Sequence, residues 1–343
     1  MKTSTTLLTL LWVPIAALGH HSVTALYDDT VVELEGEVTS VLWRNPHVGF
    51  SMNVRDENGE IQEWDMAMTA LSNLRRWQIP RDFLVVGEAI RVAGRPSRRG
   101  DRAMYISNAL RPNGEEILLL ADAVPRWSDR TVEMSESRRA GVGDPSEPER
   151  GIYRVWSRPP GVSNPFFQMD ELGRHLTDSA RAAVAAYVQQ TDIPIRDCTP
   201  KGMPTIMEAP YPWEFIRRGN DLILHQEEYD TRRTIHMAAE ASSDGETESL
   251  LGYSVGGWEG DTLVVTTTNS NWRHLNTRGI PLSADAVSVE RFTMRPDGSR
   301  MDWEMTVTDP ATFVEPVTLR QHWVWYPDAV VDSYDCLIAA EDQ

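Results

Sequence analysis

The chain has 343 residues, of which 41% are hydrophobic, and this is enough apolar material for the cores of two ordinary domains. Its formal net charge is −18 and its isoelectric point is near 4.9. A charge of this sign repels phosphate backbones and anionic membrane surfaces, so the composition argues against nucleic acid as a partner.

The amino terminus has the three parts of a secretory signal peptide. Lys2 precedes an apolar run over residues 7–18, and Ala17 and Gly19 supply the small residues of a cleavage site. We therefore expect residues 1–19 to be removed. The mature chain is then expected to have no integral membrane segment and to be periplasmic or secreted.

Residues 20–114 predict a small OB-like barrel. Alternating segments at 31–43, 48–54 and 61–66 are followed by a short helix that Thr69 caps and whose Leu71, Leu74 and Trp77 share a face. Two more strands follow at 89–93 and 104–110. Five short strands with one helix suit an OB-like barrel, with a sandwich as the alternative. Residues 115–165 are rich in proline and charge and are interpreted as a linker.

Residues 166–343 predict a helix followed by a larger antiparallel β-barrel. Thr177 begins the helix, and strands then recur at hairpin spacing up to a last one at 331–338. The clearest hairpin lies at 252–268, where Gly260 can take the positive φ of the turn. Roughly nine such strands fit an up-and-down barrel large enough to enclose a ligand, and the fold class is mainly β with a few short helices.

The chain has two cysteines, Cys198 and Cys336, near the two ends of this second half. In an oxidising compartment they can form a disulfide that closes the domain. The alternatives are a pair of buried thiols or a catalytic thiolate, and the export signal favours the disulfide.

Histidines near the new amino terminus are candidate metal ligands. Cleavage before His20 leaves its α-amine and imidazole able to chelate one ion, and His21 or His47 can add a second imidazole. Such a nitrogen set suits Cu(II), so copper is the candidate cofactor. The alternative for His47 is a turn histidine bonded to a backbone carbonyl.

Charged residues on two adjacent barrel strands are candidates for catalysis and binding. Because side chains alternate between faces, His225 and Glu227 are expected on one face, and Arg232 and His236 on one face of the next strand. If these faces line the lumen, Glu227 or Asp230 can act with His236 as general acid and base. The candidate ligand-binding residues are His225, Arg232, Trp258, Trp272, Trp303 and Trp323. The alternative is an exposed strand face with cross-strand ion pairs.

Several motifs resemble known bacterial families. His20-His21-Ser22, Gly36-Glu37-Val38 and the WRNPHV sequence at 43–48 resemble an exported domain of unknown function, the DUF6152 type, over about residues 20–112. The CTP and GMP motifs at 198–204, RTIH at 233–236 and GWEGDTLVV at 257–265 resemble a region of uncharacterised proteobacterial secreted proteins. The second barrel is similar to lipocalin-like proteins at the level of the fold. These resemblances imply an exported protein but no established activity.

Three functional hypotheses follow. The first is a periplasmic binding protein that holds a small apolar or aromatic ligand in the second barrel. The second is a cofactor-independent isomerase, hydratase or cyclase that uses the carboxylates and histidine named above. The third is a copper-binding or copper-redox protein. The sequence does not decide whether the protein is an enzyme.

Overall fold

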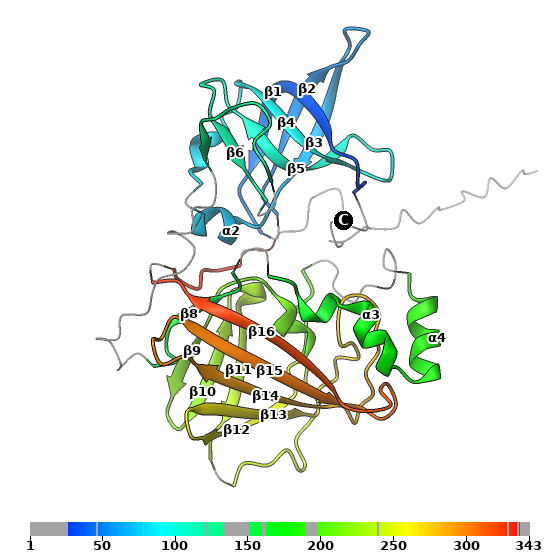
Figure 1. The fold of residues 1–343 in the computed structure, drawn as a ribbon, viewed down its shortest axis with the longest axis vertical. Coiled ribbons are helices and arrows are strands. Elements are labelled where there is room, and N and C mark those ends of the chain that lie inside the picture. Colours follow the sequence, from blue (N-terminus) through cyan, green and yellow to red (C-terminus); the bar gives the residue numbers. More distant parts are fainter. Residues whose placement is uncertain are drawn as a thin grey trace, which may run out of the picture.

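The computed structural model describes residues 27–45, 47–77, 79–120, 123–132, 151–159, 162–188, 192, 198–238, 240–327, 329–334 and 336. It contains a small β-barrel from the first half of the chain and a larger one from the second half, one above the other in Figure 1. The predicted fold class is therefore confirmed. The predicted signal peptide, residues 1–19, and the candidate metal ligands His20 and His21 lie outside the described residues.

The first barrel closes in the order expected of an OB fold. Its strands are β1 (Val32–Leu42), β2 (Gly49–Arg55), β3 (Ile61–Ala67), β4 (Ala89–Pro96) and β5 (Ala103–Leu110). β1 pairs antiparallel with both β2 and β4, and β3 pairs parallel with β5. Gly36 pairs with both β2 and β4. The position requires glycine because a side chain there would collide with the Asn53 carbonyl oxygen.

The helix α2 (Leu71–Arg76) and the short helix η1 (Arg81–Phe83) connect β3 to β4. Leu71, Leu74 and Trp77 are buried in the first core, as their spacing predicted. The predicted cap is wrong by one residue, because the N-cap is Ala70 and its side chain makes no capping bond. The first free amide, Leu71 N–H, instead donates to Asn45 Oδ1 at 3.2 Å, so a tertiary contact replaces the local cap.

The segment interpreted as a linker supplies strands to both barrels. β6 (Glu116–Leu118) and β7 (Thr131–Val132) extend the first sheet beyond β5. The buried Glu116 carboxylate holds this extension, since it accepts hydrogen bonds from Asn108 Nδ2 and from the backbone amides of residues 126–128. β8 (Val155–Ser157) enters the second barrel between β16 and β9.

The second barrel closes through β10-β11-β12-β13-β14-β15-β16-β8-β9. Its remaining strands are β9 (Trp213–Arg218), β10 (Asp221–Gln226), β11 (Thr231–His236), β12 (Tyr253–Glu259), β13 (Thr262–Thr268), β14 (Val287–Met294), β15 (Arg300–Thr308) and β16 (Val317–Trp325). Neighbours are antiparallel except β11 and β12. The predicted hairpin at 252–268 is confirmed, with Gly260 at a φ of 61° between β12 and β13.

The strand predicted at 331–338 is not formed over residues 331–334, which belong to no strand. The reason is that β16 already pairs with β8, through Val324 with Ser157 and Trp325 with Trp156. The closing strand therefore comes from the segment before the barrel and not from the end of the chain.

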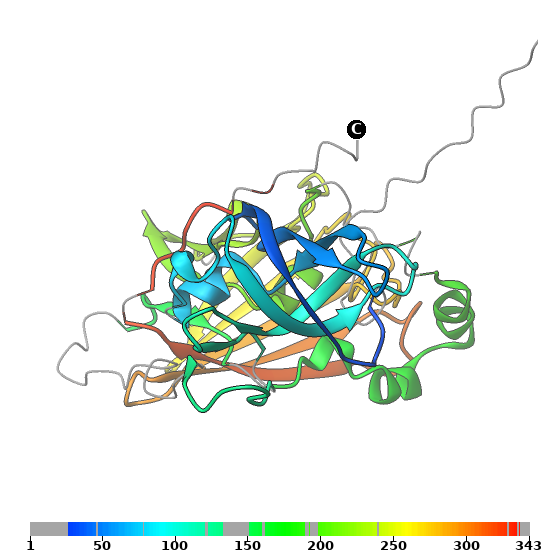
Figure 2. The same cartoon turned by 90° about the horizontal axis from the view of Figure 1, so that it is seen from above.

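Short helices lie around the second barrel: η4 (Pro165–Phe167), α3 (Met169–Leu172), η5 (Gly173–His175), α4 (Asp178–Ala186), η6 (Thr205–Glu208) and η7 (Glu228–Asp230). Thr177 caps α4 as predicted, since its hydroxyl accepts a hydrogen bond from Ala180 N–H at 3.3 Å. The first barrel lies across the second in Figure 2, with α3 and α4 at the side. None of the helices in the described part of the chain has the length and apolar character needed to cross a bilayer.

Aromatic side chains fill the centre of the second barrel. The Trp213 ring centroid lies 5.0 Å from that of Trp323, 5.3 Å from that of Phe215 and 6.0 Å from that of Phe292. Beside this centre, a small pocket lined by Thr267, Trp272 and Val307 measures about 10 Å³, which is room for one water molecule at most. The described residues therefore form a packed centre where the sequence suggested an open lumen.

Candidate functional site

The inward faces of β10 and β11 carry different residues from those predicted. Leu224 and Gln226 face inward from β10, and Arg233 does so from β11. His225 faces the other way, with Nδ1 3.3 Å from Glu214 Oε1 on β9, and Arg232 is exposed. A shift of one residue moves every side chain to the opposite face, and the apolar run at 222–224 does not indicate which face is buried.

The predicted acid–base residues do not share a site. Glu227 and Asp230 lie at the turn between β10 and β11, whereas His236 lies at the far end of β11. Five residues of extended strand separate them by roughly 17 Å. His236 instead faces Asp221, with 3.2 Å between Nδ1 and Oδ2, and both side chains are 31% exposed. This arrangement is that of a partly solvated histidine–carboxylate contact on the outer face.

Two of the four predicted tryptophans line the centre. Trp303 and Trp323 are buried there, with ring centroids 5.3 Å apart. Trp258 is 49% exposed on β12. Trp272 is buried outside the barrel centre, where its Nε1 donates to Thr205 Oγ1 at 2.6 Å.

A buried ion pair joins five strands at the centre of the second barrel. Arg233 on β11 donates to Ser254 on β12 at 2.8 Å, Thr267 on β13 at 2.7 Å and Glu290 on β14 at 2.5 Å. Trp303 Nε1 on β15 donates to the other Glu290 oxygen at 3.1 Å. Arg233 is 1% exposed and Glu290 is fully buried. The sequence signal was the pair of adjacent arginines at 232–233, because one of two neighbouring strand residues must face inward.

The helix η6 covers one end of this centre. Gln226 Nε2 donates to the Ile206 carbonyl at 3.4 Å, and Gln321 Nε2 donates to the Met207 carbonyl at 3.2 Å. Five buried polar atoms of inward-facing residues have no hydrogen-bond partner among the described residues: Gln226 Oε1, Gln321 Oε1, Trp213 Nε1, Trp323 Nε1 and Arg233 Nη1. Each such atom costs about 1–3 kcal/mol when it stays unpaired, so this layer favours a molecule that supplies donors and acceptors.

A second buried ionic cluster holds η6 in place. Lys201 Nζ lies 3.3 Å from Glu208 Oε1 at the end of η6 and 2.9 Å from Glu228 Oε1 in η7. Burial alone lowers the pKa of Lys201, but Glu228 and Glu208 outweigh it and hold this pKa above its ordinary value. Burial raises the pKa of Glu228, although Lys201 opposes the rise. The cluster therefore retains its cation over the whole physiological range.

Sequence reasoning missed Lys201, although a signal for it exists. Lys201 is one of two lysines in a chain with 33 lysine and arginine residues, and the other is Lys2. An ammonium is a compact charge with three donors, and this suits a position between two carboxylates better than the broad guanidinium of arginine does. The one lysine that follows Lys2 in this arginine-rich chain thus lies in a buried ionic cluster.

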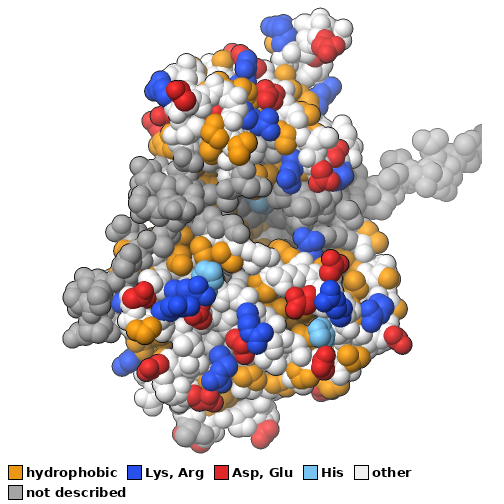
Figure 3. All heavy atoms as spheres, viewed as in Figure 1, with side chains coloured by type: hydrophobic (Ala, Val, Ile, Leu, Met, Phe, Trp, Pro, Cys, Tyr) orange, Lys and Arg blue, Asp and Glu red, His pale blue; other side chains and the backbone are white. Residues whose placement is uncertain are grey.

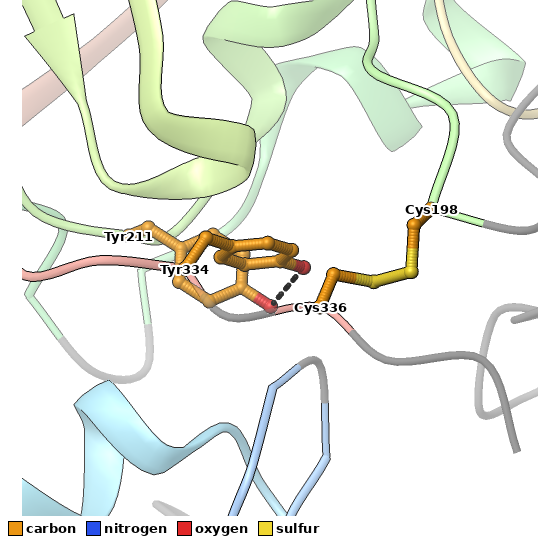
Figure 4. The surroundings of a disulfide bond; sticks show 4 residues. All are labelled: Cys198, Tyr211, Tyr334 and Cys336. Carbon is orange, nitrogen blue, oxygen red and sulfur yellow. Dashed lines mark hydrogen bonds between the residues drawn. A yellow bond between two sulfur atoms is a disulfide. The ribbon is translucent and has the colours of Figure 1, made fainter.

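The C-terminal segment at 331–336 joins this cluster to the first barrel. The predicted disulfide between Cys198 and Cys336 is present, and the Tyr211 and Tyr334 hydroxyls beside it lie 3.3 Å apart (Figure 4). Asn45 of the first barrel forms a backbone bridge with Cys336, and Arg75 of α2 pairs with Asp332. The C-terminal segment therefore connects the first barrel to the end of the second barrel that η6 covers.

The turn that carries Glu228 has a strained backbone. Tyr229 and Asp230 both adopt the left-handed region, with φ of 57° and 49°. Non-glycine residues reach this region at a cost, and here the Tyr229 ring packs at a tilt against the Tyr334 ring, with centroids 4.8 Å apart. Packing against the C-terminal segment thus stabilises the turn that places Glu228 beside Lys201.

In the first barrel, His47 is anchored as the turn alternative predicted. Its Nδ1 lies 2.9 Å from the Met68 carbonyl oxygen, and its ring meets Tyr105 edge-on with centroids 5.9 Å apart. Within the described ranges, no group of three or more His, Cys, Asp or Glu residues is arranged to hold a metal. A copper site would therefore need ligands from outside these ranges, such as His20 and His21.

In comparison with known proteins, one family model matches part of the chain. The model of DUF6152, a family of unknown function, matches residues 9–105 and thus the first barrel up to β5. This agrees with the motifs that suggested the resemblance. None of the curated proteins compared matches the chain. The family carries no activity to transfer, and its match ends before the second barrel begins.

Proposed function

We propose that the protein is a periplasmic or secreted binding protein whose second barrel holds a small aromatic molecule beneath η6. The observation that carries this proposal is the layer of unpaired buried donors and acceptors between indole rings and η6. An apolar wall with a few convergent polar groups is the usual chemistry of a small-molecule site.

The packed centre implies that binding displaces part of the cap. Gln226 and Gln321 use their amide N–H groups on η6 carbonyls and keep their amide oxygens unpaired within the described structure. A guest that moves Met207 aside can donate to these oxygens and accept from the indole N–H of Trp213 or Trp323. The preferred ligand is therefore flat, small and equipped with both donors and acceptors.

Native mass spectrometry of protein isolated from its own compartment tests the proposal. We expect a mass excess from one small molecule, and at least tenfold lower retention in Gln321→Leu, because this variant removes an acceptor from the layer. The matched control is Gln168→Leu, which replaces an exposed glutamine on the helical side of the domain and is expected to retain the molecule.

A crystal structure of the same preparation separates the alternatives. Density for an organic molecule under η6 supports the proposal. Ordered waters on the five atoms, together with no mass excess, would show that solvent satisfies them and would end it.

We also propose that His47, with His20 and His21, holds Cu(II) at the first barrel. The supporting observation is the His47 Nδ1 contact to the Met68 carbonyl, since metal-bound imidazoles usually donate their other ring N–H in this way. His47→Ala and His20→Ala are each expected to weaken Cu(II) binding at least tenfold in calorimetric titrations of the mature protein, and His175→Ala in the second domain is not. Equal affinity in all variants would contradict the site.

A further inference from the structure

The outer face of the second barrel has a charged groove that the function proposed above does not use. It has a volume of about 460 Å³ and lies over β14, β15 and β16. Cationic and acidic side chains are interspersed on the barrel face seen in Figure 3. The charged residues that line the groove are Arg291, Arg300, Asp302, Glu304, Arg320 and His322.

Strand register places the cations on either side of the acids. Arg291 on β14 is opposite Glu304 on β15, and Glu304 is opposite Arg320 on β16. Strand spacing puts the outer two columns roughly 10 Å apart. The same register sets Asp302 opposite His322. The groove thus presents two arginines at a fixed separation, with acceptors between them.

The groove has an excess of positive charge although the chain carries −18. Its lining includes three arginines and two carboxylates. The pKa of His322 reflects these charges: burial lowers it, Arg300 and the neighbouring Arg295 lower it further, and Asp302 opposes the shift. His322 is therefore neutral at pH 7 and gains a charge only at lower pH.

The arginines are held by contacts that a ligand can replace. Arg320 Nε lies 2.7 Å from Glu304, and Arg291 Nη2 lies 2.8 Å from Glu259 just outside the groove. The arginine side chains of these pairs are 67% and 40% exposed. Exposed ion pairs of this kind contribute about 0–1 kcal/mol, so an incoming anion can take over one guanidinium at little cost.

We infer that this groove binds an acidic oligosaccharide, with sugar carboxylates on Arg291 and Arg320 and hydroxyls on Asp302, Glu304 and Thr293. The interspersed donors and acceptors fit a chain that carries both carboxylates and hydroxyls. A nucleic acid fits less well, because the charged lining contains no exposed aromatic ring for base stacking.

Calorimetric titration of the intact protein with trigalacturonate tests the inference. We expect the trimer to bind at least tenfold more tightly than galacturonate, because only the trimer can reach both arginines, and neutral maltotriose not to bind. Arg291→Gln/Arg320→Gln should lower the affinity at least tenfold. The charge-matched control is Arg218→Gln/Arg232→Gln, which removes two exposed arginines from other strands.

Lower pH provides a second readout at the same site. Trigalacturonate should bind more tightly as pH falls toward 5, since His322 takes up a proton, and His322→Gln should lack this gain. Absence of trimer binding would overturn the inference. Equal losses in the groove variant and its control would also overturn it, because they would show attraction to total charge rather than to the groove.

Discussion

Replacing Lys201 with methionine is expected to lower the free energy of unfolding by about 3–5 kcal/mol. The substitution leaves Glu208 and Glu228 buried without their cation, and each of these residues is at most 4% exposed. The contact that holds the end of η6 to the turn at 228–230 is lost at the same time. Urea unfolding followed by tryptophan fluorescence measures the change.

Two further variants test whether the uncompensated carboxylates cause the loss of stability in Lys201→Met. Lys201→Met/Glu208→Gln/Glu228→Gln should recover most of the loss, because it also removes the uncompensated negative charges. Arg174→Met, which removes an exposed cation, should change stability by no more than about 0.5 kcal/mol. If Lys201→Met and Arg174→Met were equally mild, the cluster would not hold the cap.

The stability contribution of Glu228 is expected to change with pH in one direction. Burial raises the pKa of Glu228 in the folded protein, so the native state binds this proton more tightly than the unfolded chain does. Stability from this group is present below the unfolded pKa and declines as pH rises through the folded pKa. The deficit of Lys201→Met should therefore shrink on acidification.

Replacing Arg233 with methionine is expected to cost a similar amount, about 3–5 kcal/mol, because Glu290 is left charged and fully buried. The substitution also removes the hydrogen bonds that Ser254 and Thr267 accept from Arg233, so β12, β13 and β14 lose a common partner. Thermal and urea unfolding of the variant provide the measurement.

A double-mutant cycle separates the ion pair from side-chain packing. Arg233→Met/Glu290→Leu removes both charges and should be much more stable than Arg233→Met alone. Arg232→Met, the exposed neighbour on the same strand, is the control and should be nearly neutral. Additive losses in the cycle would show that Arg233 stabilises the barrel by packing and not by pairing with Glu290.

Much of the fold follows from local patterns in the chain. The hairpin around Gly260, the Thr177 cap and the buried face of Leu71, Leu74 and Trp77 are all present. Each depends on residues a few positions apart, so the relevant contacts lie within a short stretch of sequence. The two-cysteine count and the predicted signal peptide likewise predicted the Cys198–Cys336 bond.

Local sequence patterns predicted the candidate site less well than the fold. His225 and Arg232 were expected inside, but the apolar neighbours of β10 occur on both of its faces, and pairing with β9 and β11 selected Gln226 and Arg233. The acid–base residues were placed together because they are close in sequence, whereas the strand between them holds them apart. Glu290 and Trp303, which complete the Arg233 network, come from strands far along the chain.

Local alternation, turn residues and caps were thus sufficient for the number and kind of elements, since these depend on short-range backbone preferences and on the need to bury one face. Which face became the centre, which segment closed the second barrel and where Lys201 met its two carboxylates depended on long-range packing. The physical reason is that a buried charge is stable only beside a partner, and those partners are brought together by strand pairing across the whole domain.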